Sequence, residues 1–209
     1  MPGRNPALFP TLEFEQVLWQ SDVARVAGID EAGRGAWAGP VCAAAVVLPP
    51  DASLLQRLDG VRDSKLMTPA QRDAWAPVIK ACALSWGVGF ASAGEIDTLG
   101  ILPATRLAAL RALEACPADH LLTDLLLFRE LELPQTALVR GDRRSLSVAA
   151  ASVLAKTARD AQMIELEEEY PGYGFARHKG YGTQVHQAAL ARLGLCREHR
   201  RSFRITHPE

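Results

Sequence analysis

The order of apolar runs along the chain does most to limit its fold. Three β-like runs rich in Val and Ala come early and are separated by turn residues, at 23–30, 40–48 and 84–92. A nearly continuous apolar run at 121–128 predicts a buried strand, and 136–139 predicts a short fifth one. Helical patterns alternate with the later strands, at 68–83, 104–115, 145–170 and 183–193. This order favours an α/β fold, in which a sheet carries layers of helices on its faces.

Length and composition suit one domain, or one domain with an appendage. Hydrophobic residues make up 48% of the 209, which is enough for a sizeable core, and 22% are charged, as in soluble proteins. No apolar run approaches the roughly 18 residues that span a bilayer, so no membrane partner is expected. The start, Met-Pro-Gly-Arg-Asn-Pro, lacks the apolar core of a signal peptide. The four cysteines show no Cys-x-x-Cys spacing and are expected to be buried thiols in a reducing, cytoplasmic setting.

Charge is distributed unevenly along the chain. Residues 171–209 carry seven Lys or Arg against two Glu, so this segment is +5 while residues 1–170 are −6. The Pro-Gly-rich stretch 170–174 marks the change and predicts a catalytic domain over 1–170, followed by a basic C-terminal helical segment over 171–209. A basic face beside an acidic body suits a nucleic-acid backbone. An ordinary solvated helix face explains the composition equally well.

The segment 27–40 carries the most specific chemistry in the chain. Asp30 and Glu31 close the first β-like run, and Gly33-Arg34-Gly35 follows almost directly. Carboxylates hold hard cations such as Mg²⁺, while glycine lets backbone N–H groups come close to a ligand. A cation beside an exposed backbone and an arginine indicates a phosphate-bearing substrate. An Asp-Glu pair alone is usually no more than a solvated turn.

The string Gly-Ile-Asp-Glu-Ala-Gly-Arg-Gly at 28–35 resembles the signature of the type 2 ribonucleases H, the family that includes bacterial ribonuclease HII. Further blocks that resemble the family follow in its order and extend the likeness over about 26–203, at 61–66, 95–97, 141–142, 149–156, 159–160, 178–183 and 199–203. The resemblance implies a ribonuclease H-like mixed sheet flanked by helices, with a small C-terminal helical appendage.

A two-metal phosphodiester hydrolase needs three or four acidic groups that converge from separate elements. The resemblance places Asp30, Glu31, Asp124 and Asp142 as catalytic ligands of Mg²⁺ or Mn²⁺. Side chains of neighbouring strand residues point to opposite faces, so Asp30 and Glu31 can share a site only if their strand ends or twists there. Asp124 could instead be an exposed strand-end residue, and Asp142 could cap the helix that follows. Asp160 lies within a helix, where a salt bridge explains it better than metal binding.

The resemblance also assigns the residues that read the substrate. RNA differs from DNA by its 2′-hydroxyl, which the loop Gly33-Arg34-Gly35 is expected to contact while Arg34 binds a phosphate. Tyr181 is expected to stack on the sugar of the following deoxynucleotide. Lys65 either touches a phosphate or forms a structural ion pair. The chain departs from the family pattern at several positions, where it has Ala36, Trp37, Gly100 and Leu125.

The leading hypothesis is an endonuclease that hydrolyses the RNA strand of RNA–DNA hybrids. It is also expected to nick duplex DNA 5′ to an embedded ribonucleotide, leaving 3′-hydroxyl and 5′-phosphate ends. A monomer is expected, and the sequence identifies no protein partner.

Three alternatives remain open at this point. A non-catalytic nucleic-acid-binding protein would share the basic tail but would not need four acids facing phosphates. A nucleotide-binding enzyme with a phosphate loop is disfavoured because no Gly-Lys-Ser/Thr follows Gly35. Within the family, ribonuclease HIII usually carries an extra N-terminal domain, whereas only about 25 residues precede the signature here.

Overall fold

A mixed five-stranded sheet forms the centre of the computed structural model, which describes residues 9–124, 127–128 and 131–205. The strand order is β3-β2-β1-β4-β5. β1 pairs antiparallel with β2, and β2 with β3, whereas β4 runs parallel to β1 and β5 parallel to β4. The strands are β1 (Val26–Ala32), β2 (Val41–Val47), β3 (Ser85–Ala91), β4 (His120–Asp124) and β5 (Gln135–Leu138). The predicted mixed sheet is confirmed.

Four helices lie where the helical patterns predict them: α3 (Pro69–Cys82), α5 (Ile101–Glu114), α6 (Leu146–Glu169) and α8 (Gln184–Leu193). Three of them begin at a side-chain cap, because Thr68, Ser145 and Thr183 each accept a hydrogen bond from the N–H three residues ahead. Six shorter elements were not predicted: α1 (Glu13–Trp19), α2 (Leu54–Arg57), α4 (Ala93–Leu99), α7 (Phe175–His178) and the 3₁₀ turns η2 (Ser64–Leu66) and η3 (Gly141–Arg143).

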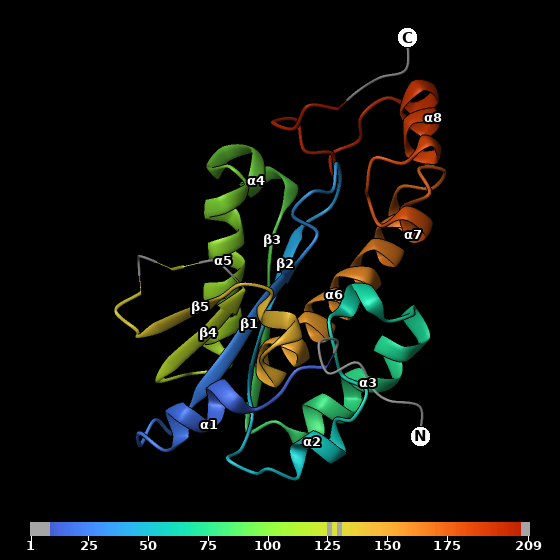
Figure 1. Ribbon diagram of the computed structural model, residues 1–209. Helices are drawn as coiled ribbons and strands as arrows, with labels where there is room; N and C mark the ends of the chain where they lie inside the picture. The colour runs from blue at the N-terminus through green and yellow to red at the C-terminus, as the bar shows by residue number, and fades with distance from the viewer. Residues whose placement is uncertain (1–8, 125–126, 129–130, 206–209) are drawn as a thin grey trace.

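Both faces of the sheet are covered, as β2 shows most clearly. Every residue of β2 is buried, and its side chains alternate between two apolar clusters. Cys42, Ala44 and Val46 pack on the side of α3 and α6, while the residues between them pack on the side of α5. Figure 1 shows α5 and α6 on opposite sides of the strands. None of the described helices is both long and apolar enough to cross a bilayer.

The strand predicted at 121–128 is shorter than expected, because β4 ends at Asp124. Leu127 is exposed and Phe128 is buried, and neither belongs to the sheet. Phe128 turns back into the cluster under α5, and its backbone N–H and C=O both bond to the side-chain amide of Gln135 at 2.8 Å. The first part of the apolar run is therefore a strand, and Phe128 is a loop residue packed in the core. Hydrophobicity alone does not distinguish these two roles. Leu125 lies outside the described residues.

The segment after Tyr170 packs onto the end of α6 and the β1–β2 loop. A small apolar cluster joins residues from these three parts, Ala38, Met163, Leu166, Tyr173, Phe175, Ala189 and Leu190. The predicted boundary at residue 170 therefore lies next to a shared core. That residues 1–170 form a catalytic domain and 171–209 a separate segment that contacts nucleic acid stays a prediction.

Candidate active site

Three of the four predicted carboxylates lie at one edge of the sheet. The pairing of β1 with the parallel strand β4 runs to Ile29, so Asp30 and Asp124 follow at the same level on adjacent strands. Asp124 Oδ1 accepts a hydrogen bond of 2.9 Å from the N–H of Gly141, which holds β4 against the turn η3 that carries Asp142. Strand pairing and this hydrogen bond bring Asp142 to the same sheet edge as Asp30, which lies more than 100 positions earlier in the chain.

A close approach of α6 to β1 places η3 at this edge. Gly28 lies under the first turn of α6, where an added Cβ would overlap the backbone of Ser147 and Val148. Only glycine lets the helix start so near the strand. Arg140, just before the turn, has a left-handed φ of 55°, an uncommon conformation for a residue with a side chain. This backbone path places Asp142 beside Asp30.

Glu31 links the aspartates to the loop that follows β1. β1 continues to Ala32, so the strand ends one residue after the Asp30–Glu31 pair. Glu31 lines a pocket with Lys65 and with Lys156 of α6. The N–H of Glu31 donates to Asp30 Oδ1 (2.8 Å), and its own carboxylate accepts from Arg34 at 3.0 Å. Glu31 therefore joins the aspartates to the Gly-Arg-Gly loop.

Burial and neighbouring carboxylates raise the pKa values of Asp30 and Asp142. Burial, followed by the nearby charge of Glu31, raises the pKa of Asp30 well above its ordinary value, and Asp142 adds to the rise. Burial, with the charges of Asp63 and Asp124, raises the pKa of Asp142 to about 6. Burial lowers the pKa of Lys65, but the surrounding aspartates outweigh this and leave it raised. The site therefore has a negative potential that favours a cation.

The donor set fits a hard divalent cation. The four carboxylates offer only oxygen donors, which Mg²⁺ and Mn²⁺ prefer, and a bound cation would relieve their repulsion. Within the described part of the chain, no three His, Cys, Asp or Glu side chains already lie close enough together to hold a metal.

All five residues predicted to contact substrate line one pocket of about 320 Å³. They are Gly33, Arg34, Gly35, Lys65 and Tyr181, and the pocket also contains Glu31, Ala32, Ser64 and Lys156. The pocket thus gathers residues from four separate segments of the chain. Sequence reasoning did not single out Lys156. Its signal in the sequence is its place at the end of the block 149–156, one of those that resemble the family.

Two buried arginines donate hydrogen bonds to the backbone of the β1–β2 loop, which contains Gly33-Arg34-Gly35. Arg200 donates to the carbonyl oxygens of Gly33, Arg34 and Gly39 at 2.8 to 3.0 Å, and burial lowers its pKa to about 9. Arg159 donates to the carbonyls of Ala38, Pro40 and Lys179 at 2.9 to 3.2 Å. One of the seven tail cations, Arg200, is therefore a structural residue and is not available to phosphates.

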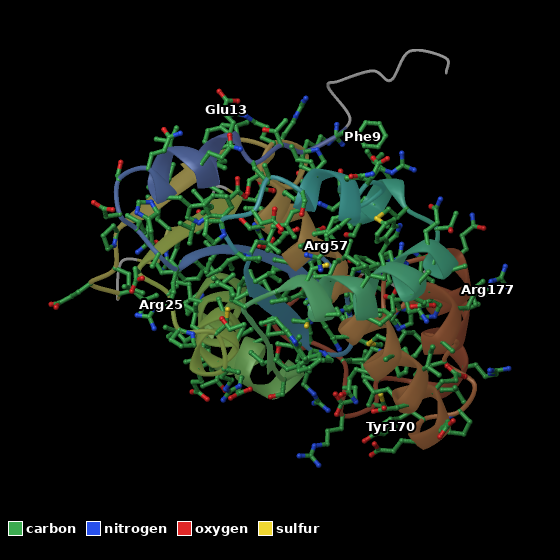
Figure 2. All side chains as sticks on the ribbon, turned by 90° about the horizontal axis from the view of Figure 1, so that it is seen from below. Phe9, Glu13, Arg25, Arg57, Tyr170 and Arg177 are labelled. Carbon is green, nitrogen blue, oxygen red and sulfur yellow. The ribbon has the colours of Figure 1, made fainter. Side chains whose placement is uncertain are left out.

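The remaining tail cations are more accessible. Lys179 is partly buried, and its Nζ donates to the carbonyl of Ala176 at 2.7 Å. The others are exposed, and Figure 2 shows one of them, Arg177, at the edge of the molecule. Their contact with nucleic acid stays a prediction.

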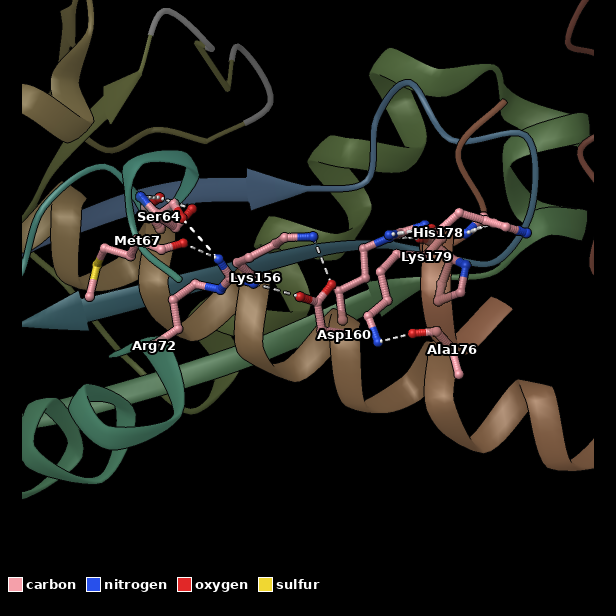
Figure 3. A network of polar contacts seen from close by, with 12 residues as sticks. Ser64, Met67, Arg72, Lys156, Asp160, Ala176, His178 and Lys179 are labelled. Carbon is pink, nitrogen blue, oxygen red and sulfur yellow. Dashed lines mark hydrogen bonds and ion pairs between the residues drawn. The ribbon is translucent and has the colours of Figure 1, made fainter. Parts of the chain in front are cut away.

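A second network explains Asp160. As predicted, it forms salt bridges, with Lys156 in the same helix at 2.7 Å and with Arg72 of α3 at 3.0 Å. Arg72 also donates to the carbonyls of Ser64 and Met67, which fixes the turn η2 against α6 (Figure 3). The network therefore sets two pocket residues, Ser64 and Lys156, relative to each other.

The family follows from comparison with known proteins. A family model described as Ribonuclease HII matches residues 27–206. The chain belongs to the ribonuclease HII family. It is 52% identical to the ribonuclease HII of Synechococcus sp. over 96% of this chain and 91% of that one. It is also 52% identical to that of Syntrophotalea carbinolica over 94% and 96%.

Solved structures agree with this assignment. The chain superposes on the ribonuclease HII in a PCNA complex from Archaeoglobus fulgidus with a TM-score of 0.71, at 26% identity over 84% of this chain and 92% of that one. A ribonuclease HIII solved in complex with Mn²⁺ gives a TM-score of 0.68 at 18% identity, over 97% and 71%, and shares the fold.

The family assignment confirms the enzyme class. The chain is a metal-dependent endoribonuclease, and its family acts on RNA–DNA hybrids and on DNA that contains ribonucleotides. The alternatives of a non-catalytic binding protein and of a phosphate-loop enzyme are set aside. Ribonuclease HIII is not supported either, because both the family model and the relatives that match about half of the residues are ribonucleases HII.

Proposed function

We propose that Asp30, Glu31, Asp124 and Asp142 hold two Mg²⁺ or Mn²⁺ ions during hydrolysis of the RNA strand. Such ions, when bound, stabilise the attacking and leaving oxygens of the displacement. The aspartates supply the negative charge that retains the cations, and Lys65 offsets part of that charge while the ions are absent. Support comes from the position of Asp30, Asp124 and Asp142 at one sheet edge, where burial and neighbouring carboxylates raise the pKa values of Asp30 and Asp142.

The pocket next to these carboxylates reads the substrate in this proposal. Gly35 is exposed, and a Cβ added to it would meet no protein atom within 4 Å, so a ribose could approach the backbone there. Arg34 is exposed as well and offers its guanidinium to a phosphate. Tyr181 presents a ring that is 37% exposed for stacking on the sugar of the next nucleotide. The observation that carries the proposal is that these residues, from distant segments, line one pocket beside Glu31.

Cleavage of a labelled DNA duplex with one embedded ribonucleotide tests this reading. We expect a single nick on the 5′ side of the ribonucleotide in Mg²⁺ or Mn²⁺, and none in chelator. Extension of the nicked strand by a DNA polymerase checks for the 3′-hydroxyl end. Single amide substitutions of the four carboxylates should abolish cleavage while the fold is kept. They are Asp30→Asn, Glu31→Gln, Asp124→Asn and Asp142→Asn. An Asp124→Asn protein with near wild-type rates would remove Asp124 from the ligand set.

A cytoplasmic location and a monomeric state stay predictions. The Archaeoglobus enzyme was solved with PCNA, but the contacts of the present chain identify no such partner.

A further inference from the structure

Three buried histidines lie behind the turn that carries Tyr181, and the proposed chemistry uses none of them. They are His178, His186 and His199, each less than a tenth exposed. The rings of His178 and His186 stack with centroids 4.4 Å apart at 16°, and His199 lies 5.2 Å from His186. Such a cluster inside a protein needs partners for every ring nitrogen.

The hydrogen bonds through this cluster run in one direction. The N–H of Cys196 donates to Nδ1 of His199 at 3.0 Å, so the proton of the neutral His199 ring is on Nε2. His199 Nε2 then donates to Nε2 of His186 at 3.0 Å. The proton of His186 is therefore on Nδ1, which donates to the carbonyl oxygen of Tyr181 at 3.0 Å. Each tautomer is fixed by the link before it.

The end of this chain is a backbone atom of the substrate pocket. The Tyr181 carbonyl accepts from His186 and from the N–H of Thr183 (2.8 Å), so two bonds fix the orientation of this peptide. The preceding residues Lys179 and Gly180 both have left-handed φ values, 53° and 79°. A turn of this kind would relax if the carbonyl lost its donor, and the Tyr181 ring would move with it.

We propose that His186 and His199 are positioning residues that set the Tyr181 ring for the sugar beyond the ribonucleotide. The proposal rests on the role proposed above for Tyr181. His178 supports the same turn separately, because its Nδ1 accepts from the N–H of Gly180 at 3.2 Å while its Nε2 donates to the carbonyl of Tyr173 at 2.8 Å.

Amide substitutions can test each link separately. An asparagine amide reaches the position of a histidine Nδ1, and a glutamine amide reaches that of Nε2. His186→Asn therefore keeps a donor for the Tyr181 carbonyl, whereas His186→Gln loses it. At position 199 the order reverses, because His199→Gln keeps a donor toward His186 and His199→Asn does not.

The readout is the ratio of single-turnover rates on a lone ribonucleotide and on a long RNA–DNA hybrid. A lost hydrogen bond corresponds to roughly three- to tenfold. We expect His186→Gln and His199→Asn to lower the ratio by about this factor, and His186→Asn and His199→Gln to keep it within about twofold. Thermal melting of all four variants shows whether each is folded. If the variants at 186 do not fold, the pair at 199 decides alone.

The outcomes separate this inference from the proposal beneath it. A purely structural role predicts that the ratio follows melting temperature, or that both amides at each position behave alike, and either result overturns the inference. If Tyr181→Ala lowers the ratio but none of the four variants does, the histidines do not position the ring. If Tyr181→Ala itself leaves the ratio unchanged, the role of Tyr181 fails and the inference fails with it.

Discussion

Replacement of Asp142 by Asn should stabilise the metal-free protein while it abolishes activity. Asp142 is only 3% exposed, and burial with the charges of Asp63 and Asp124 raises its pKa from 3.8 to about 6. At neutral pH the native state must therefore hold an ionised carboxylate that is more stable in the unfolded chain. An asparagine keeps the shape, carries no charge and can donate a hydrogen bond to Asp63, which aspartate does only when it is protonated.

The size of the effect follows from the pKa. One pKa unit corresponds to about 1.4 kcal/mol, so a rise from 3.8 to about 6 destabilises the metal-free native state by up to about 3 kcal/mol above pH 6. Between about pH 4 and 6 the native state binds a proton that the unfolded chain has released, so this penalty grows as the pH rises. For a chain of this length, the gain at pH 7 corresponds to up to about 10 °C in melting temperature.

Thermal melts in chelator and in Mg²⁺ decide this prediction. In chelator at pH 7 the variant should melt above the wild type, and the difference should vanish near pH 4. Mg²⁺ should raise the wild-type midpoint through binding to the native state and raise the variant midpoint less. Asp97→Asn is a control in which the melting temperature should fall. The Asp97 carboxylate accepts hydrogen bonds from the N–H groups of Arg201 and Ser202, so removal of its charge should destabilise the native state. A variant that melts at or below the wild type in chelator would refute the reasoning.

Three further predictions concern the pocket and its support. Gly35→Ala should leave the melting temperature unchanged but slow lone-ribonucleotide cleavage at least tenfold in a single-turnover assay, with Gly94→Ala as the silent control. Arg200→Lys should lower the free energy of unfolding by roughly 2–5 kcal/mol in urea titrations, because an ammonium group cannot serve three separate carbonyls, whereas the exposed Arg201 should tolerate Lys. Burial, with the nearby His178 and His199, lowers the pKa of His186 to about 4. The free energy of unfolding of the wild type should therefore fall by up to about 3 kcal/mol as the pH falls from 6.5 to 4. Because His186→Asn lacks this titration, its stability deficit relative to the wild type should shrink over the same interval.

The sequence was sufficient for the sheet and the long helices because their signals are local. An unbroken run of apolar residues marks β2, and side-chain caps at Thr68, Ser145 and Thr183 mark helix starts within a residue or two. The short helices α1 and α4 contain seven residues each, which is less than the window over which helical periodicity can be recognised. The end of β4 was not predicted, because Phe128 is a loop residue packed in the core and is as hydrophobic as a residue of a buried strand.

The site residues came from the resemblance, and the structure adds what holds them. Nothing local in the sequence distinguishes Arg200 from Arg201, yet Arg200 is buried against the Gly-Arg-Gly loop and Arg201 is exposed. The difference depends on contacts across more than 160 positions. Net charge of a segment therefore overstates how many cations a substrate can reach.

Arginine has a particular advantage in the support of the loop. Neither Arg159 nor Arg200 forms a salt bridge within the described residues, and together they donate to six carbonyl oxygens of the β1–β2 loop and the Lys179 turn. A carboxylate partner would have taken up the donors, whereas carbonyl acceptors let each planar fork span several backbone segments. The backbone at Gly33 and Arg34 is thereby fixed before substrate arrives. The pocket is therefore bordered by fixed backbone at Gly33 and Arg34 on one side and by the hydrogen-bonded turn of Tyr181 on the other.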